Sequence, residues 1–164
     1  MSKSKIKVML ITFFDQRGLV HHEFVPEGQT VNQHFYKEVL GRLYERVRRC
    51  RRNLWENQSW LLHHDNAPAH TALSVRRFLT SKQVTCLEHP PYSPDLAPCD
   101  FWLFPKMKAV LKGRHFASVE DIKGAVTQQL RDLKEEDFVE CFQGWQRRMI
   151  KCVNCEGDYF EGTN

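Results

Sequence analysis

The chain has 164 residues, of which 41% are hydrophobic and 27% are charged, and its formal net charge is +4. This length fits about one domain, and the composition excludes a disordered or fibrous chain. No stretch approaches the ~20 apolar residues of a membrane-spanning helix, and the first apolar run is too short for a signal peptide. We therefore expect a soluble, intracellular protein with no membrane partner.

The six cysteines are expected to be reduced thiols, because disulfide frameworks belong to short secreted chains. Cys152 and Cys155 form one CxxC pair, and no histidine follows it. A structural zinc site needs four ligands, so no zinc is expected here.

Residues 1–164 are predicted to form a single domain, since no repeat, low-complexity tract or linker divides them. Apolar residues dominate positions 6–14, which favours a strand buried on both faces. A turn from Asp15 to Gly18 follows, and residues 19–25 are expected to return antiparallel and complete a hairpin.

A long amphipathic helix is predicted next. Thr30 and Gln33 have the spacing of a capping box, which places the helix start there. Val31, Phe35 and Val39 begin an apolar repeat of four residues that continues to position 47, so one broad face packs on the sheet.

The remaining elements are shorter. In chain order we expect a buried strand over residues 60–64 that ends at Asp65, a helix from Ala72, a strand over 84–88, a stiff proline-rich loop over 89–98, a helix over 101–111 that Pro105 kinks or restarts, a helix capped by Ser118 up to residue 133, and a last helix over 135–152. A hairpin followed by strands linked through helices predicts an α/β fold.

Two carboxylates stand out for their chemistry. Asp65 closes a buried strand, and Asp100 follows the stiff proline-rich loop. The two aspartates are separated by 34 residues. Carboxylates that converge from a core strand and an adjacent helix can hold Mg²⁺, and two such ions can activate a water and stabilise the leaving oxygen of a phosphodiester. Spacing alone also allows Asp100 to be an ordinary helix-capping residue.

The neighbours of these carboxylates are more specific. The segments HDNAPAHTA (64–72) and HPPYSPDLAPCDF (89–101) closely resemble the two signature segments of mariner-type transposases of the Tc1/mariner superfamily. The match extends from about Lys5 to Glu161, including the closing segment from Trp145. The resemblance implies that Asp65 and Asp100 are catalytic and ligate metal. Asp95 matches a non-catalytic position and is assigned a loop-shaping role. His64, Asn66 and Asp95 are expected to shape the site.

The resemblance also implies an RNase H-like fold, with a mixed sheet flanked by helices. It further implies a catalytic domain that uses Mg²⁺ or Mn²⁺ to cut and rejoin DNA in the nucleus. In the family the first catalytic Asp lies on the first, central strand, upstream of the segment that begins here at Lys5. We therefore expect an N-terminally truncated domain that lacks this strand and carries two of three carboxylates, with loosely bound metal and little activity. Asp15 belongs to the hairpin turn and does not replace the missing Asp.

Loss of a central strand leaves buried backbone groups without partners, at roughly 1–3 kcal/mol each. The expected consequences are exposed sheet edges and self-association, with a homodimer as one form.

A basic cluster ends the long helix. Its members are Arg46, Arg48, Arg49, Arg51 and Arg52, with Glu45 as the one acidic neighbour. The cluster fits a solvated helix end, and it also fits weak, non-specific contact with DNA phosphates or a nuclear-import signal. The histidines near Asp65 are expected to orient or pack rather than to bind zinc.

Three hypotheses follow. The first is a mariner-derived domain that has lost cleavage and retains residual DNA or metal binding. The second is a non-catalytic interaction module that pairs with a transposase or another partner through its open sheet edge. The third is a residual nuclease dependent on Mn²⁺ or Mg²⁺. No nucleotide-binding or hydrolase-elbow motif supports other chemistry.

Overall fold

A computed structural model describes residues 7–154 of the chain. Strands β1 (Leu10–Asp15) and β2 (Gly18–Phe24) form an antiparallel hairpin, and strands β3 (Leu61–His63) and β4 (Thr85–Leu87) form a parallel pair. The four strands make two separate two-stranded sheets rather than one continuous mixed sheet. The reason is that no strand in the described part of the chain bridges the edges of β1 and β3 that face away from their partners.

The hairpin begins later than the sequence pattern indicated. Residue 6 lies outside the described residues, and the ladder starts at Leu10, although the Met9 carbonyl still accepts a hydrogen bond from the Val25 amide at 2.9 Å. Pro26 follows directly and has no N–H to extend the ladder. At the other end, Gly18 adopts φ +137°, a conformation that favours glycine.

Helix α1 (Gln33–Cys50) also begins differently from the prediction. Its N-cap is Asn32, whose side chain accepts from the Phe35 amide at 2.8 Å, so the capping box on Thr30 is wrong. The Asn32 amide bonds to the Thr30 carbonyl at 3.1 Å, which closes a tight turn before the helix and leaves Asn32 in the capping position. The expected apolar face is buried, with Tyr36, Val39 and Leu40 among its residues.

The later helical segments are α2 (Arg52–Glu56), α3 (Pro68–Thr71), α4 (Leu73–Ser81), the 3-10 turn η1 (Pro94–Leu96), the π-helical turn η2 (Cys99–Leu103), α5 (Phe104–Leu111), α6 (Val119–Asp132) and α7 (Glu135–Asn154). The four helices α4 to α7 agree with the sequence pattern in kind and differ from it at their ends. The cap on α6 is confirmed, because Ser118 accepts from the Asp121 amide at 3.1 Å. Pro105 restarts a helix at its first turn. Helices α2 and α3 were not predicted.

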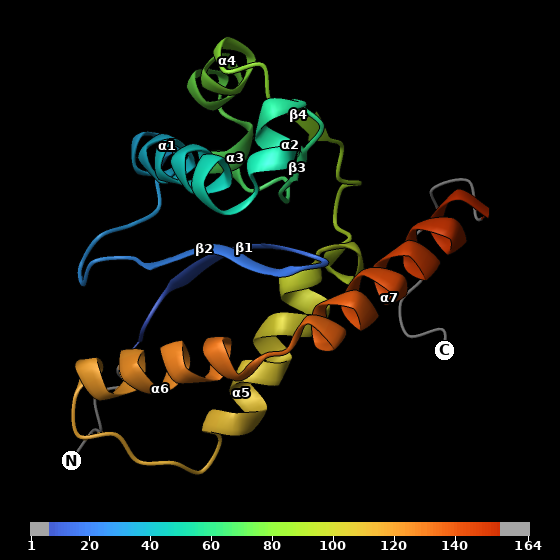
Figure 1. The fold of residues 1–164 in the computed structure, drawn as a ribbon. Helices are drawn as coiled ribbons and strands as arrows, with labels where there is room; N and C mark the ends of the chain where they lie inside the picture. The colour runs from blue at the N-terminus through green and yellow to red at the C-terminus, as the bar shows by residue number, and fades with distance from the viewer. Residues whose placement is uncertain (1–6, 155–164) are drawn as a thin grey trace.

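The hairpin lies between two helical layers (Figure 1), with α1, α3 and the β3–β4 pair on one side and α5 and α6 on the other. One core cluster joins α1, β3 and α4 around Tyr36, Leu40 and Val75. A second joins η2, α5 and α6 around Leu103, Met107 and Leu130, with hairpin side chains packed against it. Among the described helices, none is long and apolar enough to cross a membrane. That residues 1–164 form a single domain stays a prediction.

Candidate functional site

Asp65 lies just beyond the carboxyl end of β3. Its Oδ1 accepts a hydrogen bond from the Ala67 amide at 3.0 Å and lies 2.7 Å from His70 Nδ1. The polar contact with His70 lowers the pKa of the Asp65 carboxyl to about 2, against the opposing effect of burial. The carboxylate is therefore ionised at neutral pH. Both contacts engage Oδ1, and the side chain is 43% exposed, so the carboxylate can accept a further ligand.

Asp100 reaches the same region from the π-helical turn η2, which follows the proline-rich loop. The Asp100 amide donates to the Ala97 carbonyl at 2.8 Å, which fixes the start of this turn. Burial, and next the negative charge of Asp65, raise the pKa of the Asp100 carboxyl. Both aspartates line one pocket of about 440 Å³. The structure thus brings together the two carboxylates that the sequence singled out.

This donor set suits a hard divalent cation. Two carboxylates that repel each other gain from a cation between them, and Mg²⁺ and Mn²⁺ prefer oxygen ligands. Within residues 7–154, no cluster of three or more His, Cys, Asp or Glu side chains is arranged to hold a metal. An ion bound by Asp65 and Asp100 would therefore keep most of its waters. Cys155 of the CxxC pair lies outside the described residues.

A tyrosine and two histidines pack together beside Asp65. The Tyr36 hydroxyl lies 2.8 Å from His64 Nδ1, and the Tyr36 ring stacks on His70 with centroids 4.0 Å apart. Burial raises the pKa of the Tyr36 hydroxyl and lowers that of His64 to about 4, so both are neutral at pH 7. This arrangement fits the orienting role expected of these histidines. Tyr36 belongs to the buried face of α1.

A second set of contacts ties the proline-rich loop to β3. Asn66 Nδ2 donates to the His89 carbonyl at 2.6 Å, and His89 Nδ1 lies 3.0 Å from His63 Nε2. Burial lowers the pKa of His63 to about 4, so one nitrogen of the pair donates and the other accepts. Asn66 thus holds the segment that leads to Asp100.

Helix α7 fixes the other end of this loop. Trp145 Nε1 donates to the Leu96 carbonyl at 2.9 Å, and Arg148 Nη1 donates to the Asp95 carbonyl at 3.2 Å. Asp95 Oδ1 is buried and makes no hydrogen bond within the described chain. The described contact of Asp95 with α7 is therefore made by its backbone carbonyl. Trp145 and Arg148 were not predicted as loop contacts, because their partners are distant in sequence.

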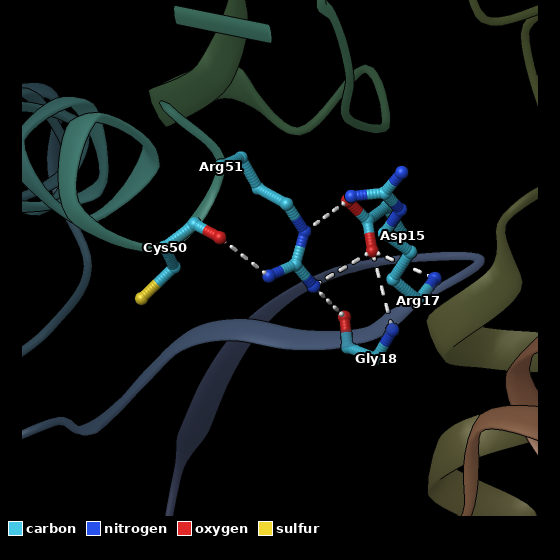
Figure 2. Close-up of polar contacts among 5 residues, drawn as sticks. All are labelled: Asp15, Arg17, Gly18, Cys50 and Arg51. Atoms are coloured by element: carbon cyan, nitrogen blue, oxygen red, sulfur yellow. Dashed lines mark hydrogen bonds and ion pairs between the residues drawn. The ribbon is translucent and has the colours of Figure 1, made fainter. Parts of the chain in front are cut away.

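The structure gives Arg51 a partner that the sequence did not indicate (Figure 2). Arg51 Nε and Nη2 donate to the two carboxylate oxygens of Asp15 at 2.7 and 2.9 Å, and Nη1 and Nη2 donate to the Cys50 and Gly18 carbonyls. The guanidinium therefore joins the end of α1 to the hairpin turn. Asp15 lines a different pocket, of about 350 Å³, from the one that holds Asp65.

The other arginines of the basic cluster are more open. Arg48 pairs with Glu45 at 3.5 Å, and Arg52 pairs with Glu56 at 3.1 Å, so Glu45 is not the cluster's one acidic neighbour. Arg46 Nε donates to the Val20 carbonyl at 3.3 Å, and Arg49 is exposed. Glu56 was missed as a neighbour because it lies on the unpredicted helix α2. Loose surface pairs leave the cluster open to phosphate.

Comparison with known proteins identifies relatives of the chain. Residues 2–57 match a family model described as a transposase, partial DDE domain. The chain is 35% identical over 156 residues to the mariner Mos1 transposase of Drosophila mauritiana, and 30% identical over 159 residues to the histone-lysine N-methyltransferase SETMAR of Homo sapiens. Both matches cover 94% of this chain, which spans 45% and 23% of the length of these two relatives.

Solved structures of Mos1 transposase also match this chain. The Mos1 transposase catalytic domain with Raltegravir and Mg matches with a TM-score of 0.86 and 35% identity, over 94% of this chain and 77% of that one. A Mos1 transposase paired-end complex with the left transposon end matches with a TM-score of 0.82 and 32% identity, over 98% of this chain and 48% of that one. These matches confirm the expected α/β, RNase H-like fold class.

Proposed function

The chain belongs to the mariner-type transposase catalytic domains, and we propose that it is a metal-binding and DNA-binding domain of that family which does not cleave DNA by itself. The observation that carries this proposal is the pocket lined by both Asp65 and Asp100, to which the described residues add no third metal-ligating carboxylate.

The proposed cofactor is Mg²⁺ or Mn²⁺, and no zinc is proposed. Mos1 structures have been solved with Mg and with Mn. Here the carboxylates of Asp65 and Asp100 would hold the ion, while His70 and the Ala67 amide fix the orientation of Asp65. When bound, such an ion supplies Lewis-acid activation of water and of phosphate oxygen. Two fixed carboxylates position it loosely, which is the reason for expecting no cleavage.

The proposed partner is DNA, bound weakly and without sequence preference, in the nucleus. Mos1 has been solved with a transposon end, and the exposed basic residues at the end of α1 and the start of α2 can contact phosphates. We assign this contact to Arg46, Arg48, Arg49 and Arg52. Arg51 is held by Asp15 and contributes through the fold.

A plasmid-nicking assay tests the absence of cleavage. The 164-residue chain is incubated with supercoiled plasmid and Mn²⁺, beside the variants Asp65→Ala and Asp100→Ala. We expect no nicking above background in any of the three. Nicking by the starting chain that both substitutions abolish would overturn the proposal and establish the residual nuclease.

Retention on DNA tests the binding interface. Replacing Arg48, Arg49 and Arg52 with Gln is expected to weaken DNA binding and to flatten its dependence on salt, by a slope of about one for each phosphate that the variant no longer touches. The control variant removes the same charge from exposed positions of another region, by Gln at Lys108, Lys112 and Arg114. Equal effects of the two triple variants would contradict the assignment of DNA contact to the end of α1 and the start of α2.

A second candidate function is the non-catalytic interaction module. The outer edges of β1 and β3 favour it, because neither edge is paired with a strand in the described part of the chain. Partners of this kind include a full-length transposase and a second copy of the chain. A pull-down at moderate salt tests binding to a transposase, and sedimentation over a range of protein concentrations tests self-association.

A further inference from the structure

The outer edge of β1 offers unpaired backbone groups. The Val25 amide bonds to the Met9 carbonyl, and hydrogen-bonded pairs alternate along an antiparallel ladder. The pairs between them in the ladder, Leu10 with Phe24 and Thr12 with His22, are therefore not hydrogen-bonded. Leu10 and Thr12 direct their backbone N–H and C=O groups away from β2. On that side the Thr12 carbonyl meets the Cys99 thiol, 4.0 Å away. A thiol at this distance is a weak substitute for a strand partner.

The outer edge of β3 faces the same region. β3 pairs with β4 in parallel and with no other strand among residues 7–154. Its first residue, Leu61, is 60% exposed, which is unusual for a large apolar side chain on a strand beside the core. Among residues 7–154 the β3 edge opposite β4 is therefore open, and Leu61 lines the pocket beside it.

The space between the two edges is one continuous slot. Two pockets, of about 350 and 440 Å³, share Thr12, Phe13 and His63, and together they follow β1 along its whole length. The first pocket is lined mostly by apolar groups, including Trp60 and Trp145. An extended chain of about six residues measures about 20 Å and matches the length of β1.

We propose that the slot between the outer edges of β1 and β3 binds an extended, mostly apolar segment of a different polypeptide as an added strand. This deepens the interaction function proposed above and rests on it. Backbone edges on both sides select an extended chain, and the apolar walls select its side chains. A folded second copy can pair with one of these edges but cannot fill the slot between them, because each described strand of this protein is already paired along one edge.

Peptide binding tests the proposal on the full chain. The probe is an acetylated and amidated peptide of alternating valine and threonine, six residues long, with two lysines at each end for solubility. Its control carries N-methyl groups on alternate amides, which keeps the side chains and removes the donors. Trp60 and Trp145 fluorescence reports binding, and hydrogen exchange reports protection of the Leu10 and Thr12 amides.

We expect saturable binding of the probe with protection of these two amides, and affinity at least about tenfold lower for the N-methylated peptide. Equal binding of the two peptides, or no protection of β1, would overturn the proposal. So would concentration-dependent dimers that the probe dissociates, because a second copy would then be the occupant.

A pair of matched variants locates the site. Leu61→Glu places a charge in the slot and is expected to weaken probe binding at least about tenfold. Leu73→Glu is the control, since Leu73 is 61% exposed and does not line the slot. Equal effects of the two substitutions would contradict the assignment. DNA retention and plasmid nicking by these variants report the proposed function separately, so either can fail alone.

Discussion

The ion pair between Arg51 and Asp15 joins two residues that are 36 positions apart in the sequence, and its removal is expected to destabilise the fold. The substitution is Arg51→Gln, which keeps much of the side-chain volume and removes the charge. The side chains are 13% and 29% exposed, so the pair lies between a buried pair, whose breakage costs about 3–5 kcal/mol, and a surface pair, worth up to about 1 kcal/mol.

The structure narrows this range. Asp15 Oδ1 also accepts from the Arg17 and Gly18 amides at 2.9 and 3.2 Å, so its carboxylate keeps two donors when Arg51 is replaced. The charge left behind is therefore partly satisfied. We expect a loss of about 2 kcal/mol, a large part of the ~5–15 kcal/mol that stabilises a typical domain.

Urea unfolding measures this loss. With a slope of about 2 kcal/mol per molar, the midpoint falls by about 1 M for Arg51→Gln. The neighbouring Arg52→Gln is the matched control, because Arg52 is 82% exposed and its pair with Glu56 contributes little. Asp15→Asn keeps an oxygen for the turn amides and completes a double-mutant cycle. Midpoints for Arg51→Gln and Arg52→Gln that agree within error would refute the reasoning.

Three further predictions concern the site. Asp65→Asn and Asp100→Asn are each expected to weaken Mn²⁺ binding about tenfold or more in a water-proton relaxation titration, whereas Asp95→Asn leaves it unchanged. His63 and His64 have pKa values of about 4 in the fold, because of burial, and about 6.5 when unfolded, so their stabilising contribution is complete above pH 6.5 and is lost as the pH falls toward 4. Each contributes a slope of at most about 1.4 kcal/mol per pH unit, and the dependence of urea midpoints on pH should be less steep for His64→Gln. Trp145→Phe leaves the buried Leu96 carbonyl without its donor and should cost about 1–3 kcal/mol by thermal unfolding; a change below about 0.5 kcal/mol would contradict this.

The sequence predicted the elements whose causes are local. The cap of α6 follows from Ser118 alone, and the hairpin follows from apolar strands around a turn. The start of α1 was missed because Thr30 and Asn32 are both good caps, and the backbone bond between them decides which one is used. Such a choice depends on how the chain leaves the preceding turn, which residue type does not encode.

The site was predictable to the extent that it rests on a motif. Asp65 and Asp100 were singled out from the segments around them, and both line one pocket. Their catalytic and metal-binding roles stay predictions. The supporting contacts were not found, because Trp145 meets Leu96 across 49 residues and Arg51 meets Asp15 across 36. Pairings over such separations are set by tertiary packing, and neither residue type nor spacing indicates them.

The slot and the metal site share a wall, and this predicts that their ligands are coupled. Leu10 and Thr12 of β1 line the same pocket as Asp65 and Asp100. An added strand there excludes water from two carboxylates that already repel each other. The free-energy cost of keeping both ionised rises, and so does their affinity for a cation. The valine–threonine probe should therefore bind more tightly when Mn²⁺ is present.

By thermodynamic linkage, the probe must also change the affinity for Mn²⁺. If Mn²⁺ raises the affinity for the probe by some factor, the probe must raise the affinity for Mn²⁺ by the same factor, and couplings of this kind are typically about 5-fold or more. Two titrations measure the two factors, one of the probe with and without Mn²⁺ and one of Mn²⁺ with and without the probe. Asp100→Asn should reduce both toward one, since it removes the repulsion that the ion relieves. Probe binding that protects β1 yet leaves Mn²⁺ affinity unchanged would show that the strand stops short of the carboxylates, and the slot would then be confined to the pocket beside Asp15.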